Sequence, residues 1–360
     1  MKKKKWLSSI LILGAVVSLA ACGNSEANVS KSSSGSDSKS SKTTTMNLST
    51  FALNQDIVES TVISPFEKDK NVDVTLDVGT AEERLTKLES GTTEVDAIEL
   101  SQINASEGKT KDLFTKISKS EVPNISNLSD GAKAIWKKGL GVPYAVNSIG
   151  IIYDEKAVGF KINSWDDLWK ASLKGKISIP DISTTFGPAM LYVASDHAGK
   201  DITSDKGKAA FNALEELSPN VVKTYSKSSD LANMFSSGEI SVAVIADYAY
   251  STVDAAKSGL TYKVPSTTYA NYNTINVPSS AKNKKQAYQY INWRISKSLE
   301  KETAVKLNEA PVNTTVKLSS DVAKNKTYGK VAKKAKSIDT TFVNKQLSDW
   351  VTQWNEILNQ

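Results

Sequence analysis

Hydrophobic and polar residues repeat along this chain with two periods, one typical of strands and one typical of helices. Between Val72 and Val78 every second residue is apolar, which predicts a strand with one buried face. The stretch 56–66 before it has apolar residues at helical spacing. Further strands are predicted at 95–100, 176–179 and 240–245, and further helices at 81–89, 206–217, 229–235, 248–258, 284–296 and 344–358. Short strands that alternate with helices predict an α/β fold with largely parallel sheets.

A capping box opens one more predicted helix, because Ser164 is followed three residues later by Asp167. Helical spacing places Trp165 and Trp169 on one face of this helix, among apolar neighbours that indicate a core position. The same core interpretation applies to Trp293, Trp350 and Trp354.

The N-terminal residues have the pattern of a secretion signal. Residues 1–21 contain four consecutive lysines, no acid and a short apolar run, which is typical of a signal peptide and too short for a confident membrane span. The segment ends in Leu-Ala-Ala-Cys, which resembles the lipobox of bacterial lipoproteins. That resemblance implies cleavage before Cys22 and a diacylglycerol on its thiol. We therefore expect a protein that is lipid-anchored to the outer face of the bacterial cell membrane without spanning it.

A tether is predicted to follow the anchor. Residues 22–45 are rich in serine and lack aromatic side chains, so they cannot bury enough apolar surface to offset the entropy lost on ordering. The folded body is expected to comprise residues 46–360.

Composition narrows the possible chemistry. The chain has one cysteine and one histidine, His197, which excludes an internal disulfide and a multi-histidine metal site. The two commonest nucleotide-binding glycine motifs are absent from the sequence. His197 falls near a predicted helix end and is not expected to bind a ligand. No cofactor and no metal are therefore predicted.

Length and charge bear on domain number and partners. The 360 residues favour two domains. The formal charge of +6 falls to +2 without residues 1–21, because four lysines lie there and leave 41 basic residues against 39 acidic ones. A nearly neutral mature chain lacks the excess positive charge that is typical of nucleic-acid-binding proteins.

Five sequence blocks carry a resemblance to a known family. They lie at 142–153, 164–177, 237–240, 277–283 and 309–313. In this order they resemble the solute-binding proteins of ABC importers, and within them the spermidine/putrescine-binding branch and its iron-, thiamine- and phosphonate-binding relatives. The resemblance covers essentially all of the predicted body.

The resemblance implies a two-lobed periplasmic-binding-protein fold of type II, with crossing hinge strands and a ligand cleft between the lobes. One lobe would comprise 46–147 plus 273–312, and the other 148–272 plus 313–360. Such a cleft is also where small-molecule sites are expected on general grounds. The lobes would close over the solute, and the partners would be an ABC permease and its ATPase subunit, with the receptor itself a monomer.

Family ligand positions can be carried over motif by motif. In polyamine-binding members, aromatic residues sandwich the aliphatic chain and carboxylates pair with its ammonium groups. The corresponding positions here are Asn54, Gln55, Ser101, Ile103, Asp181, Thr184, Ala246, Asn271 and Asn273. Only Ser101 and Asp181 keep the residue type. Most of the aromatic and acidic residues of a polyamine site are therefore replaced by other, uncharged residues.

The residues themselves offer a different set of ligand groups. The run from Asp181 to Ala189 would collect hydroxyl and N–H groups at a helix start, which suits a phosphate, phosphonate or carboxylate. An ordinary N-cap is an equally open interpretation. Asp247 and Tyr248 follow the strand predicted at 240–245, at the carboxyl end where α/β sheets bind ligands, although Asp247 could simply cap a helix.

Taken together, the predicted ligand-binding residues are Asn54, Gln55, Ser101, Gln102, Tyr144, Asp181, Ser183, Thr184, Thr185, Asp247, Tyr248, Tyr272 and Asn273, with Tyr144 or Tyr272 available to stack on a planar ligand. The predicted function is capture of a small polar or charged organic solute, as in the polyamine-binding relatives, for an importer. One alternative is a phosphate-, phosphonate- or thiamine-type ligand in the same fold. Another is a surface hydrolase that uses carboxylates such as Asp166 and Asp167, although acids in the first turn of a helix also suit its dipole.

Overall fold

The computed structural model describes residues 43–52 and 54–358, which fall within one structural unit. The predicted signal peptide, Cys22 and most of the predicted tether lie outside the described residues. Thr44 and Thr45, which the sequence assigns to the tether, form the first two residues of a strand and pair with Val72 and Asp73. The tether prediction is therefore wrong at its last two residues, because two β-branched threonines extend a parallel ladder.

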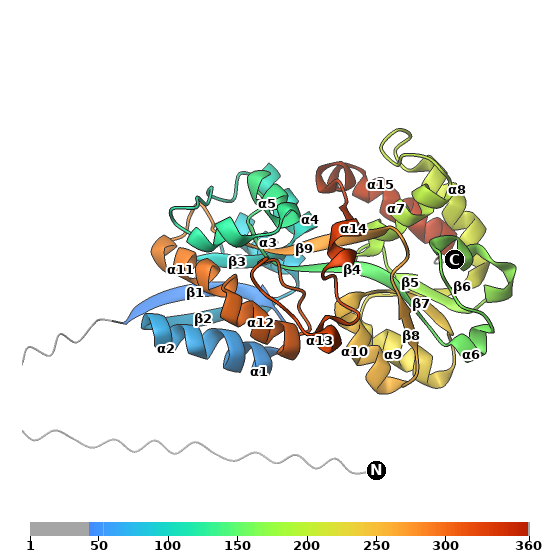
Figure 1. Cartoon of the computed structure of the whole chain (residues 1–360). Coiled ribbons are helices and arrows are strands. Elements are labelled where there is room, and N and C mark those ends of the chain that lie inside the picture. The colour runs from blue at the N-terminus through green and yellow to red at the C-terminus, as the bar shows by residue number, and fades with distance from the viewer. Residues whose placement is uncertain (1–42, 53, 359–360) are drawn as a thin grey trace, which may run out of the picture. The chain divides into compact units, whose positions relative to one another are not determined.

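The strands form one continuous, curled arrangement (Figure 1). Their bounds are β1 Thr44–Phe51, β2 Val72–Gly79, β3 Ala97–Ser101, β4 Val142–Tyr153, β5 Ile177–Pro180, β6 Val221–Tyr225, β7 Val242–Ala246, β8 Thr261–Lys263, β9 Thr268–Asn276 and β10 Ala335–Ser337. Their spatial order is β2-β1-β3-β9-β4-β7-β5-β6, with β10 beside β9 and β8 beside β4. The pairs within β2-β1-β3 and within β7-β5-β6 are parallel, whereas β4 and β9 pair antiparallel to each other.

Helices cover both halves of this arrangement. The α-helices are α1 Gln55–Val58, α2 Ser64–Lys70, α3 Ala81–Glu89, α4 Gln102–Thr110, α5 Asp130–Lys137, α6 Glu155–Val158, α7 Gly187–His197, α8 Lys208–Leu217, α9 Ser228–Ser237, α10 Tyr250–Ala256, α11 Lys284–Arg294, α12 Lys297–Lys306, α13 Ser320–Ala323, α14 Lys330–Lys334 and α15 Thr340–Leu358. Shorter helical turns are η1 Glu59–Ile63, which is a π-helix, and the 3₁₀ turns η2 Pro123–Asn127, η3 Trp165–Trp169, η4 Ala171–Leu173, η5 Ser218–Asn220 and η6 Asp247–Ala249. Within the described part of the chain, no helix is both long and apolar enough to cross a membrane.

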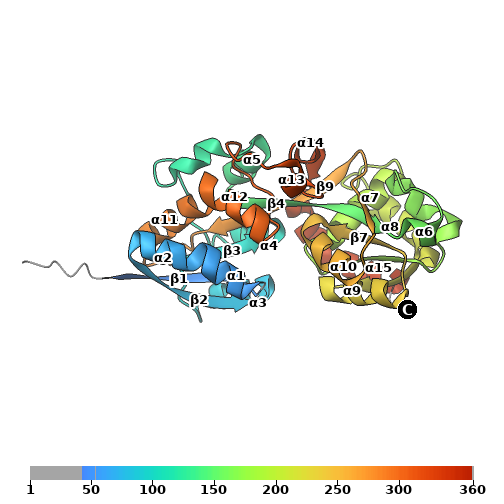
Figure 2. The same cartoon turned by 60° about the horizontal axis from the view of Figure 1, so that its bottom comes forward.

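The strand β4 joins the two halves. It is buried along all twelve residues; residues 142–148 pair with β9 on one half, and residues 149–153 pair with β7 on the other. Figure 2 shows β4 and β9 passing between the two halves. One hydrophobic core draws on residues 46–146 and 270–312, which we call the first lobe. Two adjoining cores draw on 149–269 and 338–354, which we call the second lobe.

Most predicted elements have counterparts in the structure. The helix predicted at 81–89 has those bounds, and its Thr80–Glu83 capping box explains where it starts. The helix predicted at 56–66 is divided into α1, the π-helix η1 and α2. The capping box at Ser164 is present, but it opens the 3₁₀ turn η3 rather than an α-helix. Trp165, Trp350 and Trp354 are buried, as predicted, and Trp169 and Trp293 pack against the two cores.

Candidate functional site

Two sets of parallel strands end close to the crossing strands. Ser101, the last residue of β3, lies opposite Asn273 of β9, and Ala246, the last residue of β7, lies opposite Ile149 of β4. The carboxyl ends of the first-lobe and second-lobe sheets therefore face the same stretch of β4 and β9. This is the place where open α/β sheets bind ligands.

Amide side chains connect β3, β9 and β10 at this point. The Gln102 backbone N–H donates to Asn271 Oδ1 at 3.0 Å, and Asn271 Nδ2 donates to Asn273 Oδ1 at 2.9 Å. Gln102 Nε2 donates to Ser337 Oγ at 3.0 Å, while its buried Oε1 has no partner among the described residues. The structure thus brings the predicted residues Gln102 and Asn273 together through Asn271.

The other predicted residues of the first lobe lie at the neighbouring strand ends. Asn54 follows β1 in a left-handed conformation with φ of 51°, which asparagine tolerates better than most residues. Gln55 Nε2 donates to the Phe51 carbonyl at 2.6 Å. Ser101 caps α4, and its hydroxyl also donates to Asn104 Oδ1, so its one donor is used inside the lobe.

The loop that follows β5 closes on itself. Asp181 Oδ1 accepts from the N–H and the hydroxyl of Ser183, and Asp181 Oδ2 accepts from Thr224 at 3.2 Å. Thr184 Oγ1 donates to the Asp181 carbonyl at 2.7 Å and accepts from Gly187 N–H at 3.1 Å. A Cβ on Gly187 would lie 2.1 Å from the Asp181 carbonyl oxygen, so only glycine lets the loop pack against α7. Within this group of predicted residues, Ser183 is exposed, and Asp181, Thr184 and Thr185 are half-buried.

Asp247 lies between the lobes rather than on a surface. It is 2% exposed, and its carboxylate accepts from Asn147 Nδ2 at 3.1 Å and from the N–H and hydroxyl of Thr327 at 2.6 and 2.5 Å. Burial raises the pKa of Asp247 to about 6, although the hydrogen bonds from Thr327 and Asn147 oppose this shift. Each of these donors is a neutral group of the protein itself, and contact of this carboxylate with a solute stays a prediction.

The three predicted tyrosines occupy different environments. Tyr144 is 3% exposed and donates to Glu99 Oε2 at 3.3 Å, so it lies in the first-lobe core and not at the strand ends. Tyr272 is also buried, with its hydroxyl against the start of α5, where a Cβ on Gly131 would lie 2.2 Å away. Tyr248 is 37% exposed, and its ring centre lies 6.3 Å from that of Phe186. Of the three, Tyr248 is the most exposed.

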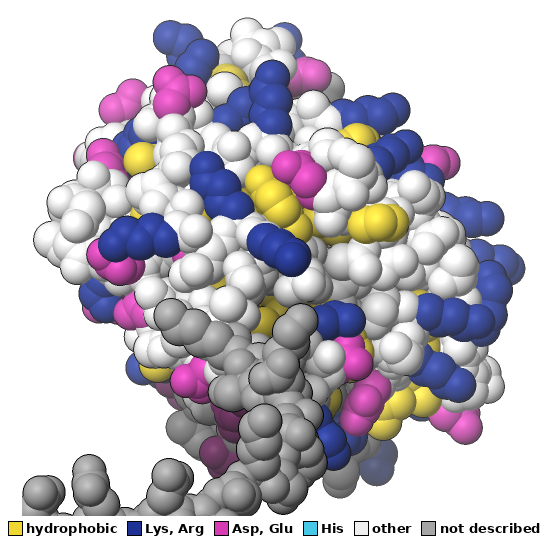
Figure 3. Space-filling model, turned by 90° about the vertical axis from the view of Figure 1, so that its left-hand side faces the viewer, with side chains coloured by type: hydrophobic (Ala, Val, Ile, Leu, Met, Phe, Trp, Pro, Cys, Tyr) yellow, Lys and Arg dark blue, Asp and Glu magenta, His cyan; other side chains and the backbone are white. Residues whose placement is uncertain are grey.

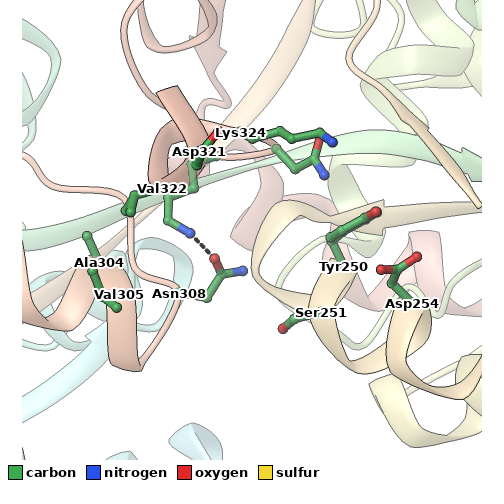
Figure 4. A pocket seen from close by; sticks show the side chains of 11 residues that line it. Tyr250, Ser251, Asp254, Ala304, Val305, Asn308, Asp321, Val322 and Lys324 are labelled. Atoms are coloured by element: carbon green, nitrogen blue, oxygen red, sulfur yellow. Dashed lines mark hydrogen bonds between the residues drawn. The ribbon is translucent and has the colours of Figure 1, made fainter. Parts of the chain in front are cut away.

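A cavity between the lobes adjoins these residues (Figure 4). Its volume is about 360 Å³, within the range of roughly 300–1,000 Å³ that small-molecule sites occupy. It lies between α10 of the second lobe and α12 of the first and is closed by the segment 321–326. Asn308, in its wall, donates to the carbonyl oxygens of Asp247 and Tyr248 at 3.3 and 3.2 Å, which ties the cavity to the predicted site.

Sequence reasoning missed the residues of this cavity. Asn308 stands directly before the family block at 309–313, which was the available signal. Lys326 lies in a lysine-rich stretch that is typical of a solvent-exposed segment, yet it is buried. Only the path of the chain back across the hinge brings these two residues together.

Known solute-binding proteins resemble this chain in sequence. The sequence profile of the family described as bacterial extracellular solute-binding protein matches residues 61–330. The chain is 27% identical over 238 residues to the spermidine/putrescine-binding periplasmic protein of Escherichia coli. That match covers 60% of this chain and 63% of the Escherichia coli protein, so it spans less than two thirds of that relative.

Solved structures resemble it over a larger share. An ABC transporter structure from Clostridium perfringens is 48% identical, with a TM-score of 0.81, and the match covers 87% of this chain and 100% of that one. A spermidine/putrescine ABC transporter substrate-binding protein from Streptococcus pneumoniae has a TM-score of 0.72 at 18% identity, covering 87% and 99% of the two chains. At that identity the likeness concerns the fold alone. These matches confirm the predicted two-lobed α/β fold.

Proposed function

The chain belongs to the bacterial extracellular solute-binding proteins, and from this premise we propose that it captures a small polar or charged organic solute between its lobes and delivers it to an ABC permease. One observation carries the proposal. Polar groups from the first lobe (Gln102), from a crossing strand (Asn273) and from the second lobe (Tyr248) lie at strand ends that face the same stretch of β4 and β9.

A site between two lobes suits capture followed by delivery. A solute shifts a protein towards a closed state only if it binds that state more tightly than the open one. A solute that contacts both lobes meets this condition, since closure adds contacts from the second lobe to those from the first. The permease can then distinguish loaded from empty receptor by shape.

Two classes of solute are candidates for the bound ligand. The Escherichia coli relative is named for spermidine and putrescine, so a polyamine is the first candidate. The alternative is a phosphate-, phosphonate- or thiamine-type ligand. The carboxylates of Asp181 and Asp247 both accept hydrogen bonds from the protein itself, which occupies part of their acceptor capacity and supports the second class over a polyamine.

We further propose the following cellular setting. Cys22 carries the lipid, the receptor is held at the outer face of the cell membrane, and it works as a monomer with an ABC permease and its ATPase subunit. The lobes are divided at 46–147 plus 273–312 and 148–272 plus 313–360. Basic and acidic side chains are interspersed on the first-lobe face in Figure 3, and this mixture supports the proposal that nucleic acid is not a partner.

The contacts of Asp166 and Asp167 support a receptor over a surface hydrolase. Asp166 Oδ1 lies 2.7 Å from His197 Nδ1, and His197 stacks on Trp169 with ring centres 3.9 Å apart. Asp167 completes the capping box and pairs with Lys170 at 2.7 Å. Both carboxylates therefore stabilise local structure. We propose no catalytic activity for this chain.

Isothermal titration of the purified chain without residues 1–22 tests the proposal. The panel comprises polyamines, thiamine phosphates, aminophosphonates and sugar phosphates, and one class is expected to bind. Tyr248→Ala should then weaken binding at least tenfold, because it removes the exposed aromatic face at the end of β7. Tyr288→Ala is the matched control, since Tyr288 of α11 packs against the first-lobe core away from the strand ends, and it should change affinity less than threefold.

Two results would contradict the proposed function. One is turnover of any solute in the panel, which would make the protein an enzyme. The other is equal loss of affinity in Tyr248→Ala and Tyr288→Ala, which would place the site elsewhere.

A further inference from the structure

We propose that the cavity between α10 and α12 binds the anionic group of the captured solute, a carboxylate or phosphoryl group, with the Lys326 ammonium as its counter-ion. The inference rests on the proposed function, because the anionic group belongs to the solute that the receptor captures. It narrows the solute to a small organic acid, with or without an amino group.

Lys326 is a buried cation with unused donors. It lines the cavity, is 8% exposed, and its ammonium donates to Asn308 Oδ1, the contact marked by the dashed line in Figure 4. An ammonium has three N–H donors, and within the described chain no acid forms an ion pair with this one. A buried charge is costly unless it is paired, so an anion in the cavity would relieve an existing cost.

The protein frame holds this ammonium in place. The neighbouring Thr327 is fixed by two hydrogen bonds to Asp247 Oδ2 and by its hydroxyl contact with Ser148 at 2.7 Å. Asn308 is oriented from the other side, because its Nδ2 donates to two backbone carbonyls of the second lobe. Its Oδ1 is thereby directed at Lys326. The ammonium is therefore a preorganised group, which reduces the entropy lost when a ligand binds.

The Asp247 carboxylate attracts the Lys326 ammonium, but among the described residues the two form no ion pair. The hydrogen bonds that this carboxylate accepts come from the neutral side chains of Thr327 and Asn147. Asp254 accepts from the Tyr250 hydroxyl, and Asp321 is an exposed residue in the first turn of α13. Desolvation lowers the pKa of Lys326, and the attraction of the Asp247 carboxylate opposes this shift only in part.

The same two acids define what else the solute can carry. Asp254 and Asp321 line the cavity together with Lys326 and Lys324, so both signs of charge are present in its wall. An amino acid could place its carboxylate at Lys326 and its ammonium towards an acid. A polyamine, in contrast, would bring positive charge next to a buried ammonium, which is unfavourable at short range in a partly desolvated site.

Isothermal titration with four probes tests the inference on the chain without residues 1–22, at pH 7 and fixed salt. The probes are 4-aminobutanoate, succinate, inorganic phosphate and putrescine. The first differs from putrescine only in having a carboxylate in place of one aminomethyl group. At least one anionic probe should bind at least tenfold more tightly than putrescine. Lys326→Met should weaken the binding of that probe at least tenfold.

Lys306→Met is the matched control. Lys306 of α12 is exposed, pairs with Glu302 and does not line the cavity, so its loss should change affinity less than threefold. Lys326→Met is expected to fold, since methionine removes a desolvated charge and keeps the apolar stem. A melting temperature at or above that of the parent would show this.

Three results would overturn the inference: putrescine binding as tightly as every anionic probe, no anionic probe binding, or equal effects of the two lysine variants. A chain that binds putrescine alone would still satisfy the proposed function. A chain that binds neither these probes nor any solute of the wider panel would fail both.

Discussion

Two buried polar clusters of this molecule are built on different chemistry. The first-lobe cluster pairs full charges: Arg294 contacts Glu309 at 2.6 Å and Glu99 at 3.7 Å, and its guanidinium lies 4.1 Å over the ring of Tyr144. Tyr290 donates to Glu99 as well, at 2.8 Å. This cluster lies within one lobe, so its members move together.

The hinge cluster joins the lobes through the Asp247 carboxylate, the Lys326 ammonium and several neutral groups that lie between them. Asp247 is held by Asn147 and Thr327, and Asn308 reaches its carbonyl from the end of α12. The hydrogen bonds to Asp247 come from neutral donors and contribute about 1.5–3 kcal/mol each, whereas removing one partner of a buried ion pair costs about 3–5 kcal/mol. Contacts that must rearrange when lobes move are therefore cheaper to break when one partner is neutral. We accordingly expect the first-lobe cluster to keep its lobe rigid and the hinge cluster to permit motion.

The largest effect is expected from Arg294→Met in the first-lobe cluster. It leaves the buried carboxylate of Glu99 and the half-buried carboxylate of Glu309 without this cation, which should lower the free energy of unfolding by about 3–5 kcal/mol. Urea denaturation measures this loss. Lys306→Met, which breaks an exposed pair with Glu302, is the control and should cost less than about 0.5 kcal/mol. A loss below about 1 kcal/mol in Arg294→Met would show that the two clusters do not differ as described.

An intermediate effect is expected from Asp247→Asn in the hinge cluster, and it should depend on pH. The pKa of Asp247 is about 6 in the folded chain against 3.8 ordinarily, so the folded state binds the proton more tightly. The stabilisation that comes from this tighter proton binding is complete below pH 3.8. It is lost as the pH rises through 6, by at most about 1.4 kcal/mol per pH unit. Asp247→Asn should flatten that slope in urea denaturation between pH 4 and 7.

Thr327→Val sharpens the same test. It removes a hydroxyl donor that favours the carboxylate, so the pKa of Asp247 should rise further and the loss of stability should continue to a higher pH. An unchanged slope in both variants would mean that Asp247 does not titrate in this range.

The smallest effect is expected from Glu300→Gln, next to the first-lobe cluster. Burial raises the pKa of Glu300 to about 8, so the folded chain holds a neutral acid at pH 7 that glutamine can imitate. Its Oε2 accepts from Asn313 N–H at 2.8 Å, as a glutamine oxygen would. The free energy of unfolding at pH 7 should change by less than about 1 kcal/mol.

The pH dependence of this third variant has a definite sign. The folded pKa lies above the ordinary 4.5, so the contribution of Glu300 is lost as the pH rises through 8. Above pH 8 the parent chain should therefore lose stability relative to Glu300→Gln. A large loss in the variant already at pH 7 would show that Glu300 is ionised and belongs to the charged cluster.

The elements that could be predicted from sequence are those defined by a local pattern of hydrophobic and capping residues. The strand from Val72 and the helix from Ala81 have period and caps that arise within a few residues. Periodicity did not predict the strands β4 and β9, and crossing strands between the lobes were expected only from the family resemblance. β4 is buried on both faces, so it has no alternation to detect, and β9 mixes tyrosines with asparagines at positions that only cross-strand pairing explains.

The candidate site was predictable only in its general location. Asp247 and Tyr248 lie at the end of a strand, as predicted, but one is buried among hinge contacts and the other is exposed beside Phe186. Sequence cannot separate two adjacent residues in this way, because their exposure depends on which segments return across the hinge. Tyr144 is the same case: the Glu99 and Arg294 that surround it lie far from it along the chain.

The sequence by itself therefore determined the class of this protein: a largely parallel α/β body with the ordered blocks of a solute-binding family, and a predicted lipid anchor at Cys22. Such features depend on local periodicity and on motifs that lie within one segment. Only the tertiary structure decided which polar groups are already satisfied and which remain available. The free donors of Lys326 exist because the chain crosses the hinge a further time and buries an ammonium beside Asn308, a contact between residues eighteen positions apart. Electrostatic partnership of this kind depends on position in space, and no local pattern encodes it.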